Sequence, residues 1–254
     1  EALDQHPAAG PLAIAYARKL LLGQKGEQAL QVLAAVPIGD DQTRAYLACE
    51  RSHIFREMGE FDDAVIAALD QCVHCFGGVD VLVLNAGIVP KSALIEDLDP
   101  AIWDKSMNIN LTASQRLMTA SIPFLKLGVD PCVVIVGTKN APAPGKSMAA
   151  YSCAKAALTQ LGRIAALELA PHGVRVNTVH PDAVFDTGIW TKDVLETRAA
   201  AYGLTVDQYK RRNLLKAEIT SHDVAGVVRV MAGPTFRTVT GAQVPVNGGD
   251  ERTI

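Results

Sequence analysis

Residues 77–87 read Gly-Gly-Val-Asp-Val-Leu-Val-Leu-Asn-Ala-Gly, a short apolar run that ends in Asn-Ala-Gly. An apolar run of this length between glycines is typical of a buried strand. Further apolar runs at 132–136, 174–179 and 243–246 alternate with helical patterns at 102–125, 149–169 and 223–231. Because strands that alternate with long helices pair in parallel, residues 76–254 are predicted to form an α/β domain.

The chain before residue 76 has a different pattern, in which apolar residues recur only at helical spacing. Four helices are predicted, around 12–21, 29–34, 43–58 and 61–76. Ala29-Leu30 and Ala64-Val65 occupy the same place in two helix pairs and lie 64 − 29 = 35 residues apart. A helix pair that repeats about every 34 residues resembles the tetratricopeptide repeat. The residues that carry this resemblance in the second pair are Phe55, Gly59, Phe61 and Ala64. Residues 1–75 are therefore predicted to be an all-helical, repeat-like segment and a candidate surface for a protein partner.

Composition excludes several classes of function. The 254 residues include 24 Lys and Arg against 27 Asp and Glu, a formal charge of −3. Such an even balance of basic and acidic residues does not indicate a nucleic-acid surface. The sequence contains no run of 18 apolar residues, so it predicts no membrane span. Five cysteines and no secretory h-region predict a reduced, cytoplasmic protein. Cys72 and Cys75 have the spacing of metal ligands, but no second Cys/His pair accompanies them, so no metal is expected.

The chemistry is concentrated in Tyr151-Ser-Cys-Ala-Lys155, with Thr138 upstream at the carboxyl end of a predicted strand. Tyr151 and Lys155 lie one helical turn apart and therefore share a face. An ammonium beside a phenol is expected to lower the tyrosine pKa, so that Tyr151 exchanges a proton with an alcohol or carbonyl oxygen. The alternative is structural: Tyr151 packs and Lys155 extends its ammonium to solvent.

Other motifs stand in a fixed order around this pair. They are Asn85-Ala86-Gly87, Asn110, Arg175-Val-Asn177, Pro181, Thr240-Gly241 and Asn247-Gly248-Gly249. In this order and spacing the chain resembles the short-chain dehydrogenase/reductase family over residues 61–254. The resemblance implies the C-terminal part of a Rossmann-type parallel sheet flanked by helices, an oxidoreductase activity and an NAD or NADP cofactor.

The resemblance also implies roles for single residues. Tyr151 would be the acid/base, Thr138 would hold the substrate oxygen, and Asn110 would link the lysine to a water relay. Lys155 would tune Tyr151 and bind the nicotinamide ribose. The expected cofactor contacts are Asn85, Ala86 and Gly87 on the adenosine side, and Pro181, Ala183 and Val184 at the nicotinamide amide.

A narrower resemblance rests on Thr138–Lys146, Pro181–Phe185 and Gly188–Lys216. These stretches look like the dehydrogenase module of bifunctional aldolase/dehydrogenases of the rhamnulose-phosphate type. This implies a small-molecule substrate, a hydroxyaldehyde or sugar-derived alcohol such as lactaldehyde. Lys139, Asn140 and Trp190 become candidate substrate contacts under a lid at 185–215. For Lys139 a solvated loop charge is an equally good interpretation.

The chain departs from the family pattern before Asn85. No G-x-x-x-G-x-G turn occurs there, so the first strands and the loop that holds the cofactor pyrophosphate have no counterpart. We expect the N-terminal helices or a second chain to cover the strand edge that this leaves. Small residues along 149–169 favour a homo-oligomer through that helix. The alternative function is a non-catalytic interaction protein, in which helical repeats are fused to a truncated dehydrogenase remnant.

Overall fold

The computed structural model describes residues 25–34 and 61–249. The helices predicted at 12–21 and 43–58 lie outside these ranges. The chain divides into two compact units, Glu1–Val79 with Arg116–Phe124, and Asp80–Gln115 with Leu125–Ile254. Every residue predicted to take part in chemistry belongs to the second unit.

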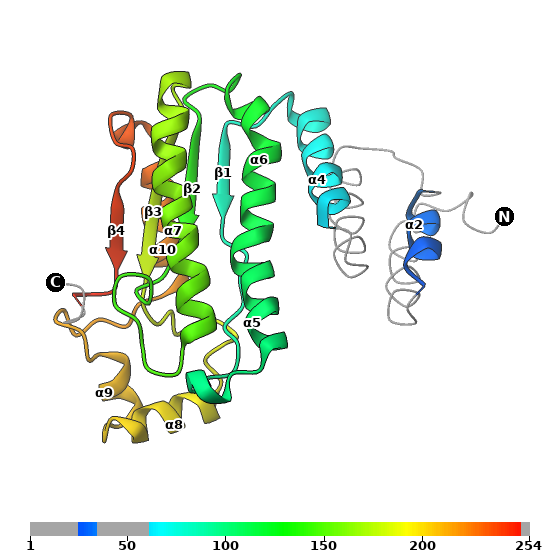
Figure 1. Cartoon of the computed structure of the whole chain (residues 1–254). Helices are drawn as coiled ribbons and strands as arrows, with labels where there is room; N and C mark the ends of the chain where they lie inside the picture. The colour runs from blue at the N-terminus through cyan, green and yellow to red at the C-terminus, as the bar shows by residue number, and fades with distance from the viewer. Residues whose placement is uncertain (1–24, 35–60, 250–254) are drawn as a thin grey trace, which may run out of the picture. The chain divides into compact units, whose positions relative to one another are not determined.

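The described part of the first unit is helical, as the spacing of its apolar residues predicts (Figure 1). Helix α2 spans Gly26–Ala34 and buries Ala29 and Leu33, four residues apart. Helix α4 spans Phe61–Phe76 and ends before Gly77, whose positive φ of 81° suits glycine. The resemblance to tetratricopeptide repeats stays a prediction.

The second unit is built on a parallel sheet, four-stranded within the described residues and ordered β1-β2-β3-β4. Its strands are β1 (Val81–Leu84), β2 (Cys132–Val136), β3 (Arg175–Pro181) and β4 (Gln243–Val246). Val83 of β1 is paired with Val134 of β2, which is paired with Asn177 of β3. The predicted α/β fold is confirmed. Because all strands are parallel, the loops that follow them meet at one edge of the sheet (Figure 1).

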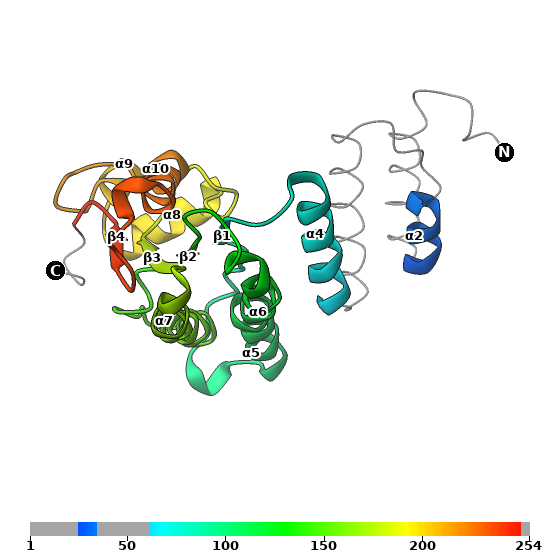
Figure 2. The ribbon, with the colours of Figure 1, turned by 90° about the horizontal axis from the view of Figure 1, so that it is seen from above.

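Helices cover both faces of this sheet. Figure 2 shows α5 (Pro100–Met107) and α7 (Ala149–Leu169) on one face and α10 (Ser221–Ala232) on the other. Gly162 lets α7 approach β2 closely, because a Cβ there would lie 2.6 Å from Ile135 Cδ1. On the opposite face Cys132 and Val134 pack against Met231 of α10 in a buried apolar cluster. Short 3₁₀ turns occupy Ile95–Asp97, Ala170–His172 and Pro234–Phe236.

The helix predicted over 102–125 is interrupted. A π-helical turn at Asn108–Thr112 separates α5 from α6 (Ala113–Leu125). Such turns are rare, and they occur frequently at functional sites. Asn110, one of the predicted catalytic residues, lies in its middle and is completely buried.

Two helices lie beyond the carboxyl ends of the strands, α8 (Lys192–Ala201) and α9 (Val206–Lys210) (Figure 1). Thr191 and Thr205 cap their N-termini by accepting hydrogen bonds from Val194 N and Gln208 N. Their inner faces form a small core of their own. Its buried members are Ala183, Phe185, Ala199 and Tyr209, with Trp190 packed against them. We call Phe185–Leu215 the lid.

Strand β1 is an edge strand within the described residues, because it is paired with β2 on one side only. Leu82 and Leu84 are buried, whereas Val81 and Val83 are exposed. No strand precedes β1 in residues 25–34 or 61–80. Among the described helices none combines the length and apolar character that crossing a membrane requires.

Candidate active site

The sheet brings Thr138 and Tyr151 together at its carboxyl edge. Thr138 follows β2 and is buried, and Tyr151 lies in the first turn of α7. The hydroxyl of Thr138 hydrogen-bonds to Tyr151, and it also accepts the backbone N–H of Asn140 at 3.3 Å. Two hydroxyl groups in contact can hold one substrate oxygen between them, as the sequence predicts.

Burial controls the protonation of Tyr151. Loss of solvent raises the pKa of this phenol above its usual value of 10.0, and the hydrogen bond from Thr138 offsets only part of the rise. The expected lowering of this pKa by Lys155 is therefore not what the structure shows: burial has the largest effect, and the lowering comes from the Thr138 hydrogen bond. In this state Tyr151 is a proton donor suited to a carbonyl oxygen.

Lys155 lies one turn after Tyr151 in α7 and is buried, with 3% of its surface exposed. The alternative in which its ammonium reaches solvent is wrong. Its ammonium donates to the carbonyl of Val136, the last residue of β2, at 2.9 Å. Burial lowers the pKa of Lys155 from 10.5 to about 8. An ammonium has three donors, so this contact leaves capacity for ligand hydroxyls.

Asn110 and Gly87 form the side of the site that faces Lys155. The Asn110 amide donates to Ile88 O at 3.0 Å and accepts from Ile88 N at 2.9 Å, which fixes the loop after β1. A Cβ on Gly87 would lie 2.8 Å from Asn110 Oδ1 and 3.4 Å from Lys155 Nζ. Only glycine lets this loop come so close to the Asn110 amide. The water relay expected at Asn110 stays a prediction.

The predicted cofactor residues lie on two neighbouring loops. Asn85, Ala86 and Gly87 directly follow β1. Pro181 ends β3 and accepts the Lys139 N–H at 2.8 Å, and Ala183 and Val184 come two residues later. Lys155 and the space kept open by Gly87 fit the two hydroxyls of a ribose. The described residues offer no glycine-rich turn for a pyrophosphate, so the fit covers one half of a dinucleotide.

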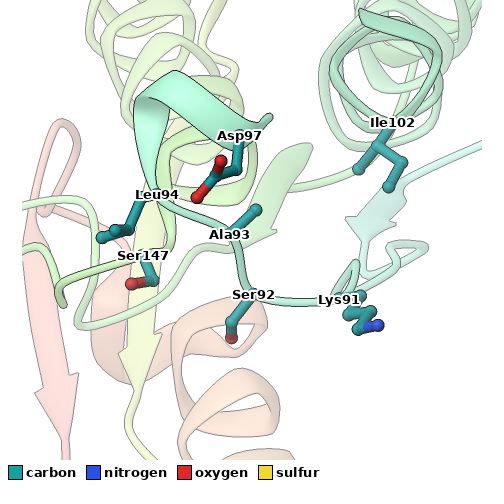
Figure 3. A pocket seen from close by; sticks show the side chains of 7 residues that line it. All are labelled: Lys91, Ser92, Ala93, Leu94, Asp97, Ile102 and Ser147. Carbon is teal, nitrogen blue, oxygen red and sulfur yellow. The ribbon is translucent and has the colours of Figure 1, made fainter. Parts of the chain in front are cut away.

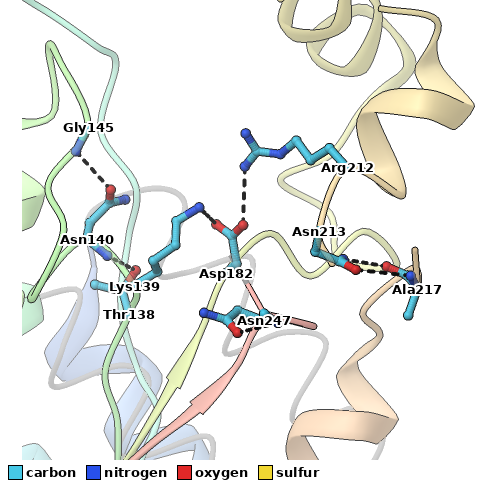
Figure 4. Close-up of polar contacts among 10 residues, drawn as sticks. Thr138, Lys139, Asn140, Gly145, Asp182, Arg212, Asn213, Ala217 and Asn247 are labelled. Atoms are coloured by element: carbon cyan, nitrogen blue, oxygen red, sulfur yellow. Dashed lines mark hydrogen bonds and ion pairs between the residues drawn. The ribbon is translucent and has the colours of Figure 1, made fainter. Parts of the chain in front are cut away.

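The predicted substrate residues differ in their surroundings, and Figure 4 shows two of them, Lys139 and Asn140. Lys139 is 2% exposed and its Nζ lies 2.6 Å from Asp182 Oδ1, so it is not a solvated loop charge. Asn140 accepts the Gly145 N–H at 3.1 Å through its side chain, which shapes the loop before α7. Trp190 packs in the lid, its ring centroid 5.0 Å from that of Phe185. Contact of these three with a substrate stays a prediction.

The sequence analysis assigned no role to His180, which directly follows the apolar run predicted as a strand at 174–179. His180 lies in β3, buried, with Nδ1 within 3.2 Å of Thr138 N and 3.0 Å of Thr138 O. Its Nε2 lies 2.6 Å from Gln243 Oε1. With the ring proton on Nε2, His180 donates to Gln243 and accepts from Thr138 N–H, and so fixes the backbone that carries the Thr138 hydroxyl. Gly137 gives the ring room, since a Cβ there would lie 2.7 Å from Nδ1.

Two cavities adjoin this constellation. The first, about 480 Å³, is shown in Figure 3 and opens between the loop after β1 and the loop before α7. It is lined by Lys91, Ser92, Ala93, Leu94, Asp97, Ile102 and Ser147. The second, about 400 Å³, lies beside α7 and β4 and includes Lys139, His180 and Arg163. Neither Tyr151 nor Lys155 lines either of these two cavities.

A parallel α/β sheet with a tyrosine–lysine pair and a threonine hydroxyl at its carboxyl edge is the arrangement that the resemblance to the short-chain dehydrogenase/reductase family predicts. Comparison with known proteins agrees. Residues 60–250 match the family model described as enoyl-(acyl carrier protein) reductase. The chain therefore belongs to the short-chain dehydrogenase/reductase family.

Individual relatives show how far the likeness extends. The chain is 33% identical over 196 residues to the uncharacterized oxidoreductase YuxG of Bacillus subtilis, covering 74% of this chain and 28% of YuxG. It is 31% identical over 180 residues to human dehydrogenase/reductase SDR family member 4, covering 70% of this chain and 61% of that protein. Ligand-free aldohexose dehydrogenase from Thermoplasma acidophilum superimposes with a TM-score of 0.65 at 25% identity, covering 74% of each chain.

Proposed function

We propose that the chain is an NAD(P)-dependent oxidoreductase that interconverts an alcohol and a carbonyl compound. The observation that carries this proposal is the meeting of three side chains at the carboxyl edge of the sheet: Thr138 is hydrogen-bonded to Tyr151, and Lys155 is buried one helical turn further on and donates to Val136 O. A nicotinamide cofactor bound at this edge supplies or accepts the hydride. NAD-dependent and NADH-bound proteins occur among the relatives and structural neighbours.

The chain's own residues would handle the proton. The Thr138 hydroxyl holds the substrate oxygen, and Tyr151 gives its phenolic proton to that oxygen as a carbonyl is reduced. The Lys155 ammonium stabilises the phenolate that remains, and its free donors bind ribose hydroxyls. Asn110, tied to Ile88, keeps the loop with Asn85, Ala86 and Gly87 against the ribose. Pro181, Ala183 and Val184 form the wall for the nicotinamide amide.

The proposed substrate is a small hydroxyaldehyde or sugar-derived alcohol. A structural neighbour at 25% identity is an aldohexose dehydrogenase. Lys139, Asn140 and Trp190 remain the proposed substrate contacts at the lid side. We also propose a reduced, cytoplasmic setting, a homo-oligomer, and a protein partner for the helical first unit.

The non-catalytic alternative rests on the missing phosphate loop alone. It leaves unexplained why Lys155 is kept buried beside Tyr151, where a charge is costly unless it serves a purpose. The relatives and neighbours named above include dehydrogenases and oxidoreductases, which favours catalysis.

The test is a titration of the purified chain with NADH and NADPH, followed by turnover with a panel of hydroxyaldehydes and hexoses. Saturable binding at micromolar cofactor is expected, and Tyr151→Phe should lower turnover by about 10²-fold or more while binding persists. Tyr202→Phe removes an exposed hydroxyl from the lid and serves as the matched control. Absence of binding at millimolar cofactor, or full activity in Tyr151→Phe, would overturn the proposal.

A further inference from the structure

A chain of charges connects the lid to the catalytic loop. Asp182, the first residue after β3, has its Oδ1 2.6 Å from Lys139 Nζ and its Oδ2 3.2 Å from Arg212 Nη2 (Figure 4). Lys139 directly follows Thr138, and Arg212 belongs to the lid. One carboxylate therefore spans the space between the hydroxyl that would hold the substrate and the segment that would cover it.

The two ion pairs of Asp182, with Lys139 and with Arg212, differ in rigidity. Lys139 is buried, and its backbone N–H also donates to Pro181 O at 2.8 Å. A buried ammonium that loses its counter-ion is strongly disfavoured, so the Lys139–Asp182 contact is fixed. The Arg212 side chain is about a quarter exposed, so its ion pair with Asp182 is partly solvated and breaks at a lower free-energy cost.

The Arg212 side chain also contacts aromatic side chains of the lid. Its guanidinium lies 5.2 Å from the Tyr202 ring centroid and 5.0 Å from that of Tyr209. Tyr209 in turn packs against Trp190, with ring centroids 6.2 Å apart. A displacement of Arg212 is thus passed directly to the aromatic core on which α8 and α9 rest.

We propose that Asp182 is a positioning residue, which holds the lid closed through Arg212 while Lys139 holds Asp182. Opening breaks the Arg212–Asp182 contact and leaves the buried Lys139–Asp182 pair intact. The lid can then move without disturbing Thr138. The consequence for turnover rests on the function proposed above, whereas the position of the lid is independent of it.

The test uses Arg212→Gln, which removes the partly solvated Arg212–Asp182 ion pair and keeps the buried Lys139–Asp182 pair. Trp103 and Trp190 are the two tryptophans of the chain, so a Trp103→Phe background makes Trp190 the sole reporter of the lid. Acrylamide quenching of Trp190 should increase. Loss of one charge-assisted hydrogen bond should also raise amide exchange in α8 and α9 by about tenfold, while β2 and β3 keep their protection.

Two matched variants and one change of solvent complete the design. Arg211→Gln removes a neighbouring, exposed guanidinium that pairs with Asp207 inside the lid at 3.2 Å, and it should leave quenching unchanged. Arg212→Lys keeps the charge and should restore most of the protection. About 1 M salt should loosen the lid of the unmodified chain but not that of Arg212→Gln, because screening acts on the contact that the variant lacks.

Quenching in Arg212→Gln equal to that in Arg211→Gln would overturn the proposal. Exchange that rises in β2 and β3 as much as in α8 and α9 would overturn it too, since the effect would then be a loss of fold. Neither readout needs cofactor or substrate. A chain that binds no NADH yet loosens its lid in Arg212→Gln would refute the proposed oxidoreductase and leave the positioning role standing.

Discussion

Replacing Lys155 by methionine should change how the stability of the second unit depends on pH. Burial lowers the pKa of Lys155 from 10.5 to about 8, a difference worth about 3 kcal/mol at ~1.4 kcal/mol per pKa unit. Below pH 8 the lysine is protonated in both folded and unfolded chains, and the folded chain bears the full cost of the buried charge. Between pH 8 and 10.5 the unfolded chain holds a proton that the folded chain has released, so stability rises with pH.

The window from pH 7 to 9.5 contains about 2 kcal/mol of this gain. Urea unfolding followed by tryptophan fluorescence measures it, because Trp103 and Trp190 both belong to the second unit. Other titrating groups act in both proteins and cancel in the comparison. Burial raises the pKa of Cys132, for example, so that thiol alone lowers stability as pH rises above 9. Between pH 7 and 9.5, the free energy of unfolding of the natural chain should therefore rise by about 2 kcal/mol more than that of Lys155→Met.

Lys192→Met is the matched control. The Lys192 side chain is 86% exposed and makes a loose pair with Glu196 at 3.8 Å, so its removal should leave the pH dependence unchanged. If the curves for the natural chain and Lys155→Met stayed parallel from pH 7 to 9.5, Lys155 would be charged throughout in the folded state. The account of a desolvated ammonium at Lys155 would then fail.

Three further outcomes follow from the same contacts. Gly87→Ala should destabilise the chain by about 1–3 kcal/mol in urea, because its Cβ would lie 2.8 Å from Asn110 Oδ1, which is fixed by Ile88. The same substitution should weaken NADH binding, and an unchanged NADH titration would contradict the proposed ribose contact. Leu167, 78% exposed on α7, should lie in the proposed homo-oligomer interface, so Leu167→Glu should lower the mass found by light scattering; a natural chain that is already monomeric at micromolar concentration would refute this. Amides of Val81–Leu84 should exchange slowly if the edge of β1 is covered as the sequence predicts, and fast exchange there would count against any cover.

Regular elements could be predicted well because each depends on a local period. The patterns at 132–136, 149–169 and 243–246 coincide with β2, α7 and β4. The helix expected over 102–125 contains a π turn that no local period announces. The turn accompanies the burial of Asn110 and its hydrogen bonds to Ile88, 22 residues earlier in the chain.

The site shows the same division between local and long-range information. Tyr151 and Lys155 could be placed on one face because helical spacing decides it. The charge of Lys139 admitted two interpretations, and neither included the partner that the fold provides, Asp182, 182 − 139 = 43 residues away. The pKa of Tyr151 was misjudged for a related reason. Its direction depends on how much solvent the folded chain removes, and a spacing of residues does not report that.

The catalytic and the phosphate-binding halves of the proposed site have separable consequences. Thr138, Tyr151, Lys155 and Asn110, the residues proposed for the proton chemistry, all lie in the second unit. A pyrophosphate that lacks two or three hydrogen bonds of about 1.5–3 kcal/mol each would bind weaker by about two orders of magnitude or more. Such contacts act equally on the bound ground state and the transition state, so their loss raises the cofactor KM and leaves kcat unchanged. Weak cofactor binding with ordinary turnover at saturation would thus mark a site whose chemistry is complete and whose phosphate contacts are missing, whereas low turnover at saturating cofactor would place the defect in the catalytic residues themselves.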